Sequence, residues 1–234
     1  MITIQIGPFP IGIDNRYDQT WNMRFFLCDR DPLFTVSVSE AELEAEKRIS
    51  PFPDDYLEFV CAYRKIAERL PEFGAFVLHG AAVCRNDRAY IFTAPSGTGK
   101  TTHATLWMRT FSDTWILNGD KPVICRKDGI FYACGTPWKG KEQYGQPQMR
   151  PVGSICLLRR APDNEIRRIS GREFVLTLLQ QIYRPSVPEN LERTLLLLDE
   201  FCAAVPAFEL KCNPDPSAAI LSCRTMTGQE PNFR

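Results

Sequence analysis

One stretch of the sequence decides how the rest of the chain is interpreted: Tyr90-Ile-Phe-Thr-Ala-Pro-Ser-Gly-Thr-Gly-Lys-Thr-Thr-His103. Its second half matches the pattern Gly, four residues, Gly-Lys-Ser/Thr, except that Ala94 stands in place of the first glycine. An apolar run precedes the glycines, and a segment that favours a helix follows them. The sequence therefore predicts a phosphate-binding loop between a buried strand and the start of a helix.

The residue types in this loop each have a chemical reason. Gly97 and Gly99 let the backbone turn successive N–H groups toward one anion, and the start of the following helix adds more donors. Lys100 supplies a cation for the outer phosphates, and Thr101 offers a hydroxyl to a magnesium ion that bridges them. We expect ATP and Mg²⁺ to be bound by Ser96, Gly97, Thr98, Gly99, Lys100, Thr101 and Thr102.

An acidic residue follows at the end of the next apolar run, Trp115-Ile-Leu-Asn-Gly-Asp120. A carboxylate at the end of a strand, shortly after the helix of a phosphate loop, is where a magnesium ligand belongs. The alternative is a turn carboxylate that only caps a loop. Because the phosphate loop precedes it, the pattern favours the metal role for Asp120.

Composition and charge limit the class of protein. The chain has 234 residues, of which 28 are Lys or Arg and 28 are Asp or Glu. This balance gives no reason to expect binding to nucleic acid or to an acidic membrane. The nine cysteines are odd in number, form no Cys-x-x-Cys pair and lie mostly in apolar runs, which indicates buried hydrophobes in a reducing compartment. Residues 1–13 lack a basic signal region, so we expect a cytoplasmic protein.

Hydrophobic periodicity predicts an α/β fold with a mixed β-sheet and flanking helices around the phosphate loop. Residues 1–50 form a small N-terminal β segment of unknown role, with strands expected in residues 1–39, and residues 51–234 form the domain that carries the loop. A helix is expected over residues 54–70. Further strands are expected at 76–83, 89–93, 114–125, 130–134, 152–159, 165–169 and 207–212, and helices at 101–111, 172–183, 190–204 and from residue 216.

These motifs resemble the P-loop kinase group that includes HPr kinase/phosphorylase and ATP-dependent phosphoenolpyruvate carboxykinase. The run from Ser96 to Thr102 is identical in type to the carboxykinase phosphate loop, and the run from Leu117 to Asp120 is similar to its acidic metal motif. Leu78-His79-Gly80 is similar to the His-Gly that precedes the loop in HPr kinase. The resemblance covers residues 76–142 well, continues weakly to about 222, and implies the carboxykinase/HPr kinase C-terminal domain fold.

The resemblance implies an ATP- and Mg²⁺-dependent kinase that phosphorylates a hydroxyl, most plausibly a serine, of a protein or peptide. The chain also resembles the small HPr-kinase-related proteins found beside peptide-modification genes, in its general sequence character and not in a particular motif. Lys100 would hold the phosphates, and Thr101 and Asp120 the metal, while Asp120, or His79 with Glu142, would handle the acceptor proton. Self-association is implied as well.

One position departs from the family pattern. HPr kinase carries two adjacent aspartates where this chain has Gly119-Asp120, and the next residue is Lys121. Three alternatives follow. Asp120 takes the acceptor proton alone, or His79 or Glu142 substitutes for the missing carboxylate. Otherwise the protein is a nucleotide-binding accessory or regulatory protein with a degenerate catalytic centre. The chain is too short for the helical extensions of a carboxykinase, which excludes that activity.

Four further residues leave alternatives open. Trp138 either stacks on the base of the nucleotide or is a buried anchor. Lys139 and Lys141 contact phosphate or an acceptor, or belong to a solvated loop. His103 is expected to be packing or surface, and the choice between ATP and GTP stays open.

Overall fold

The first strands of the chain form a small sheet of their own. In the computed structural model, which describes residues 1–230 and 232–233, β1 (Ile2–Ile6) pairs antiparallel with β2 (Phe9–Asp14). β2 pairs parallel with β3 (Phe34–Ser37), and the short helix α1 (Thr20–Met23) lies between them in sequence. Alternation along β1 buries Ile4 and Ile6 completely, so the strands expected in residues 1–39 are confirmed.

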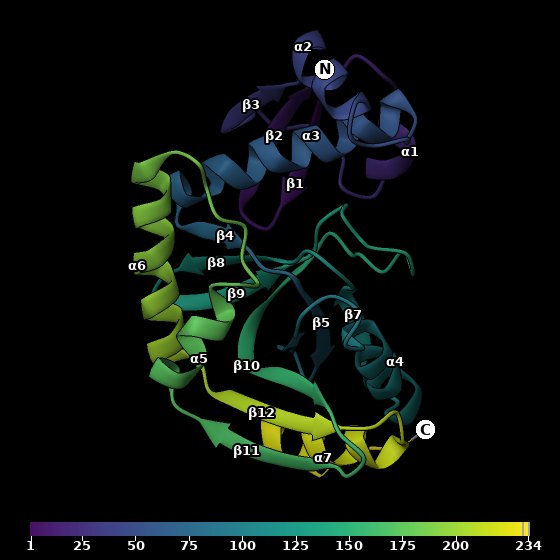
Figure 1. Cartoon of the computed structure of the whole chain (residues 1–234), viewed down its shortest axis with the longest axis vertical. Helices are drawn as coiled ribbons and strands as arrows, with labels where there is room; N and C mark the ends of the chain where they lie inside the picture. Colours follow the sequence, from purple (N-terminus) through teal and green to yellow (C-terminus); the bar gives the residue numbers. More distant parts are fainter. Residues whose placement is uncertain (231, 234) are drawn as a thin grey trace.

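Two helices cover this small sheet (Figure 1). α2 (Glu40–Lys47) begins with a capping box in which Ser39 and Glu42 satisfy each other's backbone N–H groups, a signal that the charged composition of the segment hides. α3 (Asp54–Arg69) confirms the helix expected over residues 54–70, and the 3₁₀ turn η1 (Leu70–Phe73) follows it. α3 shares a hydrophobic core with β1–β3 and also with Val77, Val123 and Cys134, so it packs between the small sheet and the rest of the chain; the division at residue 50 stays a prediction.

The larger sheet is mixed, as expected. Its strands run in the order β4-β8-β9-β10-β6-β5-β7, with β12 parallel to the second half of β10 and β11 antiparallel to β12. β6, β10 and β12 form its parallel part. The strands are β4 (Ala75–Val77), β5 (Gly80–Arg85), β6 (Arg88–Thr93), β7 (Trp115–Asn118), β8 (Val123–Lys127), β9 (Ile130–Cys134), β10 (Met149–Arg160), β11 (Glu165–Ile169) and β12 (Ala207–Cys212).

Helices cover both faces of this sheet, which gives it two hydrophobic cores (Figure 1). α4 (Lys100–Thr110) and α7 (Pro216–Thr227) pack on one face, where Phe92 meets Trp107. α5 (Gly171–Leu178) and α6 (Pro188–Ala204) pack on the other, where Phe76 meets Phe201. Successive strand residues point to opposite faces, so β5, β6, β7, β10 and β12 contribute to both of these cores. The strands β4, β8 and β9 contribute instead to the core under α5 and α6 and to the core that they share with the N-terminal segment. No helix in the described part of the chain is long and apolar enough to cross a membrane.

Two of the expected strands are broken, and the breaks lie side by side. The run 76–83 divides at Leu78-His79, because β4 pairs with β8 whereas β5 pairs with β6 and β7. The run 114–125 divides in the same way between β7 and β8, at residues 119–122. The broken segments remain hydrogen-bonded to each other, since Leu78 N donates to Pro122 O and Gly80 N to Asp120 O, each at 3.0 Å. His79 and Asp120 are thereby brought together at one edge.

The helix expected over residues 172–183 ends early, at Leu178. The chain then turns back beside the break in the first strand, where Gln181 O accepts a hydrogen bond from His79 N at 2.6 Å. Tyr183 N donates to Val77 O at 3.0 Å. This backbone pairing competes with helix formation, which sequence periodicity alone does not reveal.

Candidate functional site

The glycine loop (residues 94–99) connects β6 to α4. Gly97 and Gly99 have φ angles of +77° and +118°, which lie in the region that side chains other than glycine rarely adopt. A Cβ on Gly97 would meet no atom within 4 Å, so this glycine is needed for its backbone conformation and not for lack of space. The loop therefore owes its shape to these two positions.

The start of α4 offers free backbone donors at the end of this loop. Gly99 is the residue that caps the helix, and no side chain caps the helix there. The N–H groups of Lys100, Thr101 and Thr102 belong to the first turn, which has no acceptors within the helix. Free N–H groups and the positive end of the helix dipole together attract an anion.

Lys100 folds back over the glycine loop. Its Nζ donates to Ala94 O at 3.0 Å and to Pro95 O at 3.3 Å, and the residue is buried. Burial lowers the pKa of Lys100, while the Asp120 carboxylate acts in the opposite direction. The ammonium group thus has neutral carbonyl partners, which a more strongly attracting phosphate could replace.

Asp120 lies across the cleft from Lys100, at the break between β7 and β8. Asn118, which is fully buried, fixes this turn: its Oδ1 accepts from Asp120 N at 3.0 Å and from Lys121 N at 2.7 Å. Thr101 approaches the same turn, with its Oγ1 donating to Gly119 O at 3.4 Å. Sequence reasoning missed Asn118, although an Asn-Gly pair at the end of a strand is a turn signal.

His79 faces Asp120 from the neighbouring break. Its Nε2 lies 3.4 Å from Asp120 Oδ1. Burial lowers the pKa of His79 to about 4, and the positive charges of Lys121 and Lys100 act in the same direction. The imidazole is therefore neutral near pH 7 and can either donate one hydrogen bond or accept a proton.

A cleft of about 420 Å³ joins these groups. The structure thus brings together His79, Lys100, Thr101, Asp120 and Glu142, which come from four separate parts of the sequence. Thr98, also expected at the phosphate site, lines the adjoining pocket instead. The cleft is lined by His79, Ser96, Gly97, Gly99, Lys100, Thr101, Thr102, Gly119, Asp120, Gly140, Lys141 and Glu142.

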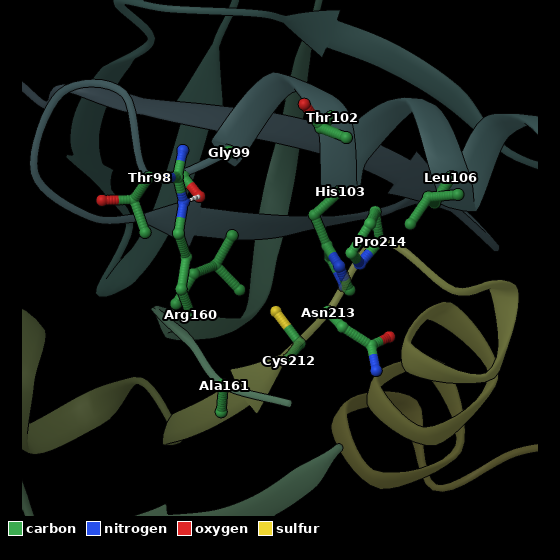
Figure 2. A pocket seen from close by; sticks show the side chains of 11 residues that line it. Thr98, Gly99, Thr102, His103, Leu106, Arg160, Ala161, Cys212, Asn213 and Pro214 are labelled. Atoms are coloured by element: carbon green, nitrogen blue, oxygen red, sulfur yellow. Dashed lines mark hydrogen bonds between the residues drawn. The ribbon is translucent and has the colours of Figure 1, made fainter. Parts of the chain in front are cut away.

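A second, more apolar pocket of about 550 Å³ adjoins the cleft on the other side of the glycine loop (Figure 2). Leu106 and Cys212 line it, and Gly99 and Thr102 are shared with the cleft. Arg160 borders it from β10 and donates to the carbonyls of Gly97 and Thr98. Sequence reasoning had no signal that separates Arg160 from other surface arginines.

His103 lines the apolar pocket from α4. It is buried, its Nε2 lies 3.0 Å from Ser222 Oγ, and its ring meets Phe92 edge-on at 4.6 Å between centroids. Trp138 is also buried, and its Nε1 donates to Phe59 O at 3.3 Å. Of the two alternatives for Trp138, the structure therefore shows the buried anchor.

A third pocket, of about 380 Å³, also contains Asp120 but none of the residues of the glycine loop. It shares Asp120, Gly140 and Lys141 with the cleft. Lys121 and Lys139 also line it, and burial lowers the pKa of each. Lys139 and Lys141 thus border a pocket, while residues 140–143 of the same loop are exposed, so both alternatives for these lysines stay open.

Comparison with known proteins gives a distant likeness in fold. No family model matches the chain, and no curated protein matches it. Solved structures that are similar to it include the HPr(Ser) kinase/phosphatase from Coxiella burnetii, at 10% sequence identity and a TM-score of 0.37. The match covers 65% of this chain and 88% of that one.

Proposed function

We propose that the protein is an ATP- and Mg²⁺-dependent kinase that resembles HPr kinase and phosphorylates a serine hydroxyl of a protein or peptide. The observation that carries the proposal is the single cleft in which Lys100 and Thr101, at the start of α4, lie opposite Asp120 and His79. A cation, free backbone donors, a carboxylate and a neutral imidazole are the groups that phosphoryl transfer requires.

The residues present fit a magnesium nucleotide. The glycine loop has open space and an uncapped helix start for phosphate oxygens. Thr101 and Asp120 supply the oxygen ligands that Mg²⁺ prefers. Among the described residues no group of three or more His, Cys, Asp or Glu forms a metal site of its own. This agrees with a magnesium ion held by one carboxylate, one hydroxyl and the phosphates of the substrate.

Each side chain has a separate role in this proposal. Bound Mg²⁺ would neutralise the charge of the phosphate oxygens. Lys100 would leave the carbonyls of the loop and bind the outer phosphates. Asp120 would orient the acceptor hydroxyl and take its proton, and the adjacent neutral His79 would hold the carboxylate in place. Glu142 lines the same cleft and is the second candidate for the proton.

The nucleotide would lie across two pockets. Phosphates on the glycine loop place the base in the apolar pocket beside Leu106 and Cys212, because Gly99 and Thr102 border both spaces. A flat, largely apolar base suits this lining. The outermost phosphate then points toward Asp120.

A nucleotide-binding accessory protein is the second candidate, and one observation favours it. Gly119 stands where the resemblance to HPr kinase implies a second carboxylate, and on the other side of Asp120 the Nζ of Lys121 lies 4.0 Å from Asp120 Oδ1. With a lysine on one side and a glycine on the other, Asp120 is the single carboxylate where the proteins that the chain resembles use a pair. Such a protein would bind nucleotide without transferring the phosphoryl group.

Titration of a fluorescent ATP analogue with Mg²⁺ tests the phosphate site. Lys100→Ala is expected to weaken binding by roughly 30-fold, because a charged hydrogen bond contributes about 2 kcal/mol. Lys127→Ala, a change of an exposed lysine on β8, is the matched control and should bind like the wild type. Unchanged affinity in Lys100→Ala would rule out the phosphate site.

Labelled ATP separates the two candidates. Transfer of the γ-phosphoryl group to a serine in a protein or peptide supports the kinase. Tight nucleotide binding without transfer to any candidate acceptor supports the accessory protein.

A further inference from the structure

A row of aromatic rings leads from the surface of the N-terminal segment to the vicinity of Asp120. It begins at Phe52 and Tyr56, which are exposed and lie 5.0 Å apart between ring centroids. Tyr56 meets Phe59 at 6.3 Å, Phe59 meets Trp138 at 5.8 Å, and Trp138 meets Tyr63 at 5.0 Å. We call these five side chains the aromatic row.

The inner part of the aromatic row is the wall of the third pocket, which also contains Asp120. α3 contributes Tyr56, Phe59 and Tyr63 to this wall, and the loop after β9 contributes Trp138. Because the pocket shares Asp120, Gly140 and Lys141 with the phosphate cleft, a group bound in it lies next to the end of a nucleotide. The pocket is therefore on the correct side of Asp120 to hold an acceptor.

The charges around this pocket are predominantly positive. Lys121, Lys139 and Lys141 line it, and Asp120 is the one acidic side chain among its described lining residues. Arg24, just after α1, adds to the positive charge beside Lys139 and lies over the exposed rings of Trp21 and Phe25. A ligand that fits this surface carries negative charge as well as apolar groups.

The apolar surface continues beyond the pocket, which favours a chain over a small molecule. Tyr56 lines the pocket and is exposed, and it contacts Phe52, which is exposed and lies outside the pocket. An extended segment with apolar side chains can follow this surface out of the pocket.

We propose that the third pocket and the aromatic row form the acceptor site, and that the acceptor is an extended acidic peptide segment in which apolar or aromatic residues flank the serine. This inference rests on the proposed kinase function. It gives the N-terminal segment a role, because α3 presents most of the row to the serine that lies beside Asp120.

Labelled ATP and a synthetic peptide library around a fixed serine test this inference. One flanking position is defined at a time, and transfer is measured with purified full-length protein. We expect peptides with Phe, Tyr or Leu near the serine and Asp or Glu beyond it to be labelled roughly tenfold more than peptides with Lys or Arg there, since tenfold corresponds to about 1.4 kcal/mol. Equal labelling of all peptides, a preference for basic ones, or no labelled peptide would overturn the inference.

Two variants test the pocket itself. Tyr56→Ala is expected to raise the KM for the preferred peptide about fivefold while kcat and nucleotide affinity stay unchanged, because removing one apolar contact costs about 1 kcal/mol. Lys139→Glu is expected to shift the library preference from acidic toward basic neighbours. A merely structural role for Lys139 would lower transfer without changing this preference.

Matched controls and a binding assay separate the outcomes. Leu196→Ala on α6 and Lys127→Glu on β8 change exposed residues outside the pocket and should leave the peptide preference intact. Failure of the wild type to bind a fluorescent ATP analogue would contradict the proposed function itself. Normal nucleotide binding with an unchanged preference in Lys139→Glu would contradict the acceptor site alone.

Discussion

The two sides of Asp120 are built in different ways. On the phosphate side, the glycine loop and the first turn of α4 come from one short stretch and present mainly backbone donors. On the acceptor side, the third pocket is assembled from α1, α3, the turn at Asp120 and the loop after β9, and it presents aromatic and charged side chains. The first surface is made of main chain, and the second of side chains.

This difference fits what each surface would bind in the proposed kinase. A phosphate group is small and always the same, so fixed N–H groups in a glycine-shaped loop suffice. A peptide acceptor is larger and varies, so its recognition depends on side chains that can be exchanged without disturbing the loop. We therefore expect substitutions on one side to change nucleotide binding and those on the other to change acceptor choice.

The largest expected effect is at Asp120, where the two sides meet. Asp120→Asn removes the charge that holds Mg²⁺ and takes the proton, so transfer of label should fall roughly 10³-fold, within the range for loss of an acid–base group. Nucleotide affinity should fall only about tenfold, because the amide oxygen and the glycine loop remain. Label transfer and a fluorescent-nucleotide titration measure the two quantities. Equal losses in both would show that Asp120 serves binding alone.

The same contrast explains what the sequence could predict. The glycine loop, α3 and most strands are predictable from the sequence, because their residue patterns are local. The break at residues 78–79 is not, since only the change of pairing partner from β8 to β6 and β7 divides that run. The break at residues 119–122 does carry local signals, the pair Asn118-Gly119 and Pro122, which the apolar residues on either side outweighed in the strand prediction.

The third pocket could not be predicted from the sequence either. Trp138 and Tyr63 are far apart in the sequence, and nothing in either segment indicates that their rings lie 5.0 Å apart. His79 is a candidate from the resemblance and Glu142 from its place in a glycine-rich loop, but that they line one cleft depends on how the loop after β9 folds back over Gly119. The hydrogen bond from Gly119 N to Tyr144 O, at 3.0 Å, makes that contact.

The helix that follows the glycine loop, α4, contains the buried His103. The stability of the folded protein should therefore depend on pH. Burial lowers the pKa of His103 to about 4, whereas an unfolded histidine titrates near 6.5. The unfolded chain therefore binds this proton first, so stability is complete above about pH 6.5 and is lost as the pH falls toward 4. Between pH 7 and pH 5 the free energy of unfolding should drop by about 2 kcal/mol from His103 alone.

Urea unfolding in magnesium-free buffer measures this drop. His103→Gln should remove its share of the pH dependence, whatever its effect on stability at pH 7. His79→Gln is the matched comparison, because burial also lowers the pKa of His79 to about 4 and each variant should remove only its own share. An unchanged pH profile in His103→Gln would show that the buried ring does not control stability in this range.

The smallest expected effect is at Arg160, which supports the glycine loop from β10. Its guanidinium group donates to the carbonyls of Gly97 and Thr98, but the contact is exposed to solvent. Arg160→Gln should therefore weaken nucleotide binding only about threefold, in line with the 1 kcal/mol or less of an exposed contact of this kind. Arg168→Gln on β11 is the control, since Arg168 is exposed and lines neither the cleft nor the apolar pocket. A fluorescent-nucleotide titration that gave a loss far above tenfold for Arg160→Gln would mean that the loop does not hold its own shape. The shape of the glycine loop would then depend on a side chain that is distant in sequence, just as the third pocket depends on side chains from separate segments.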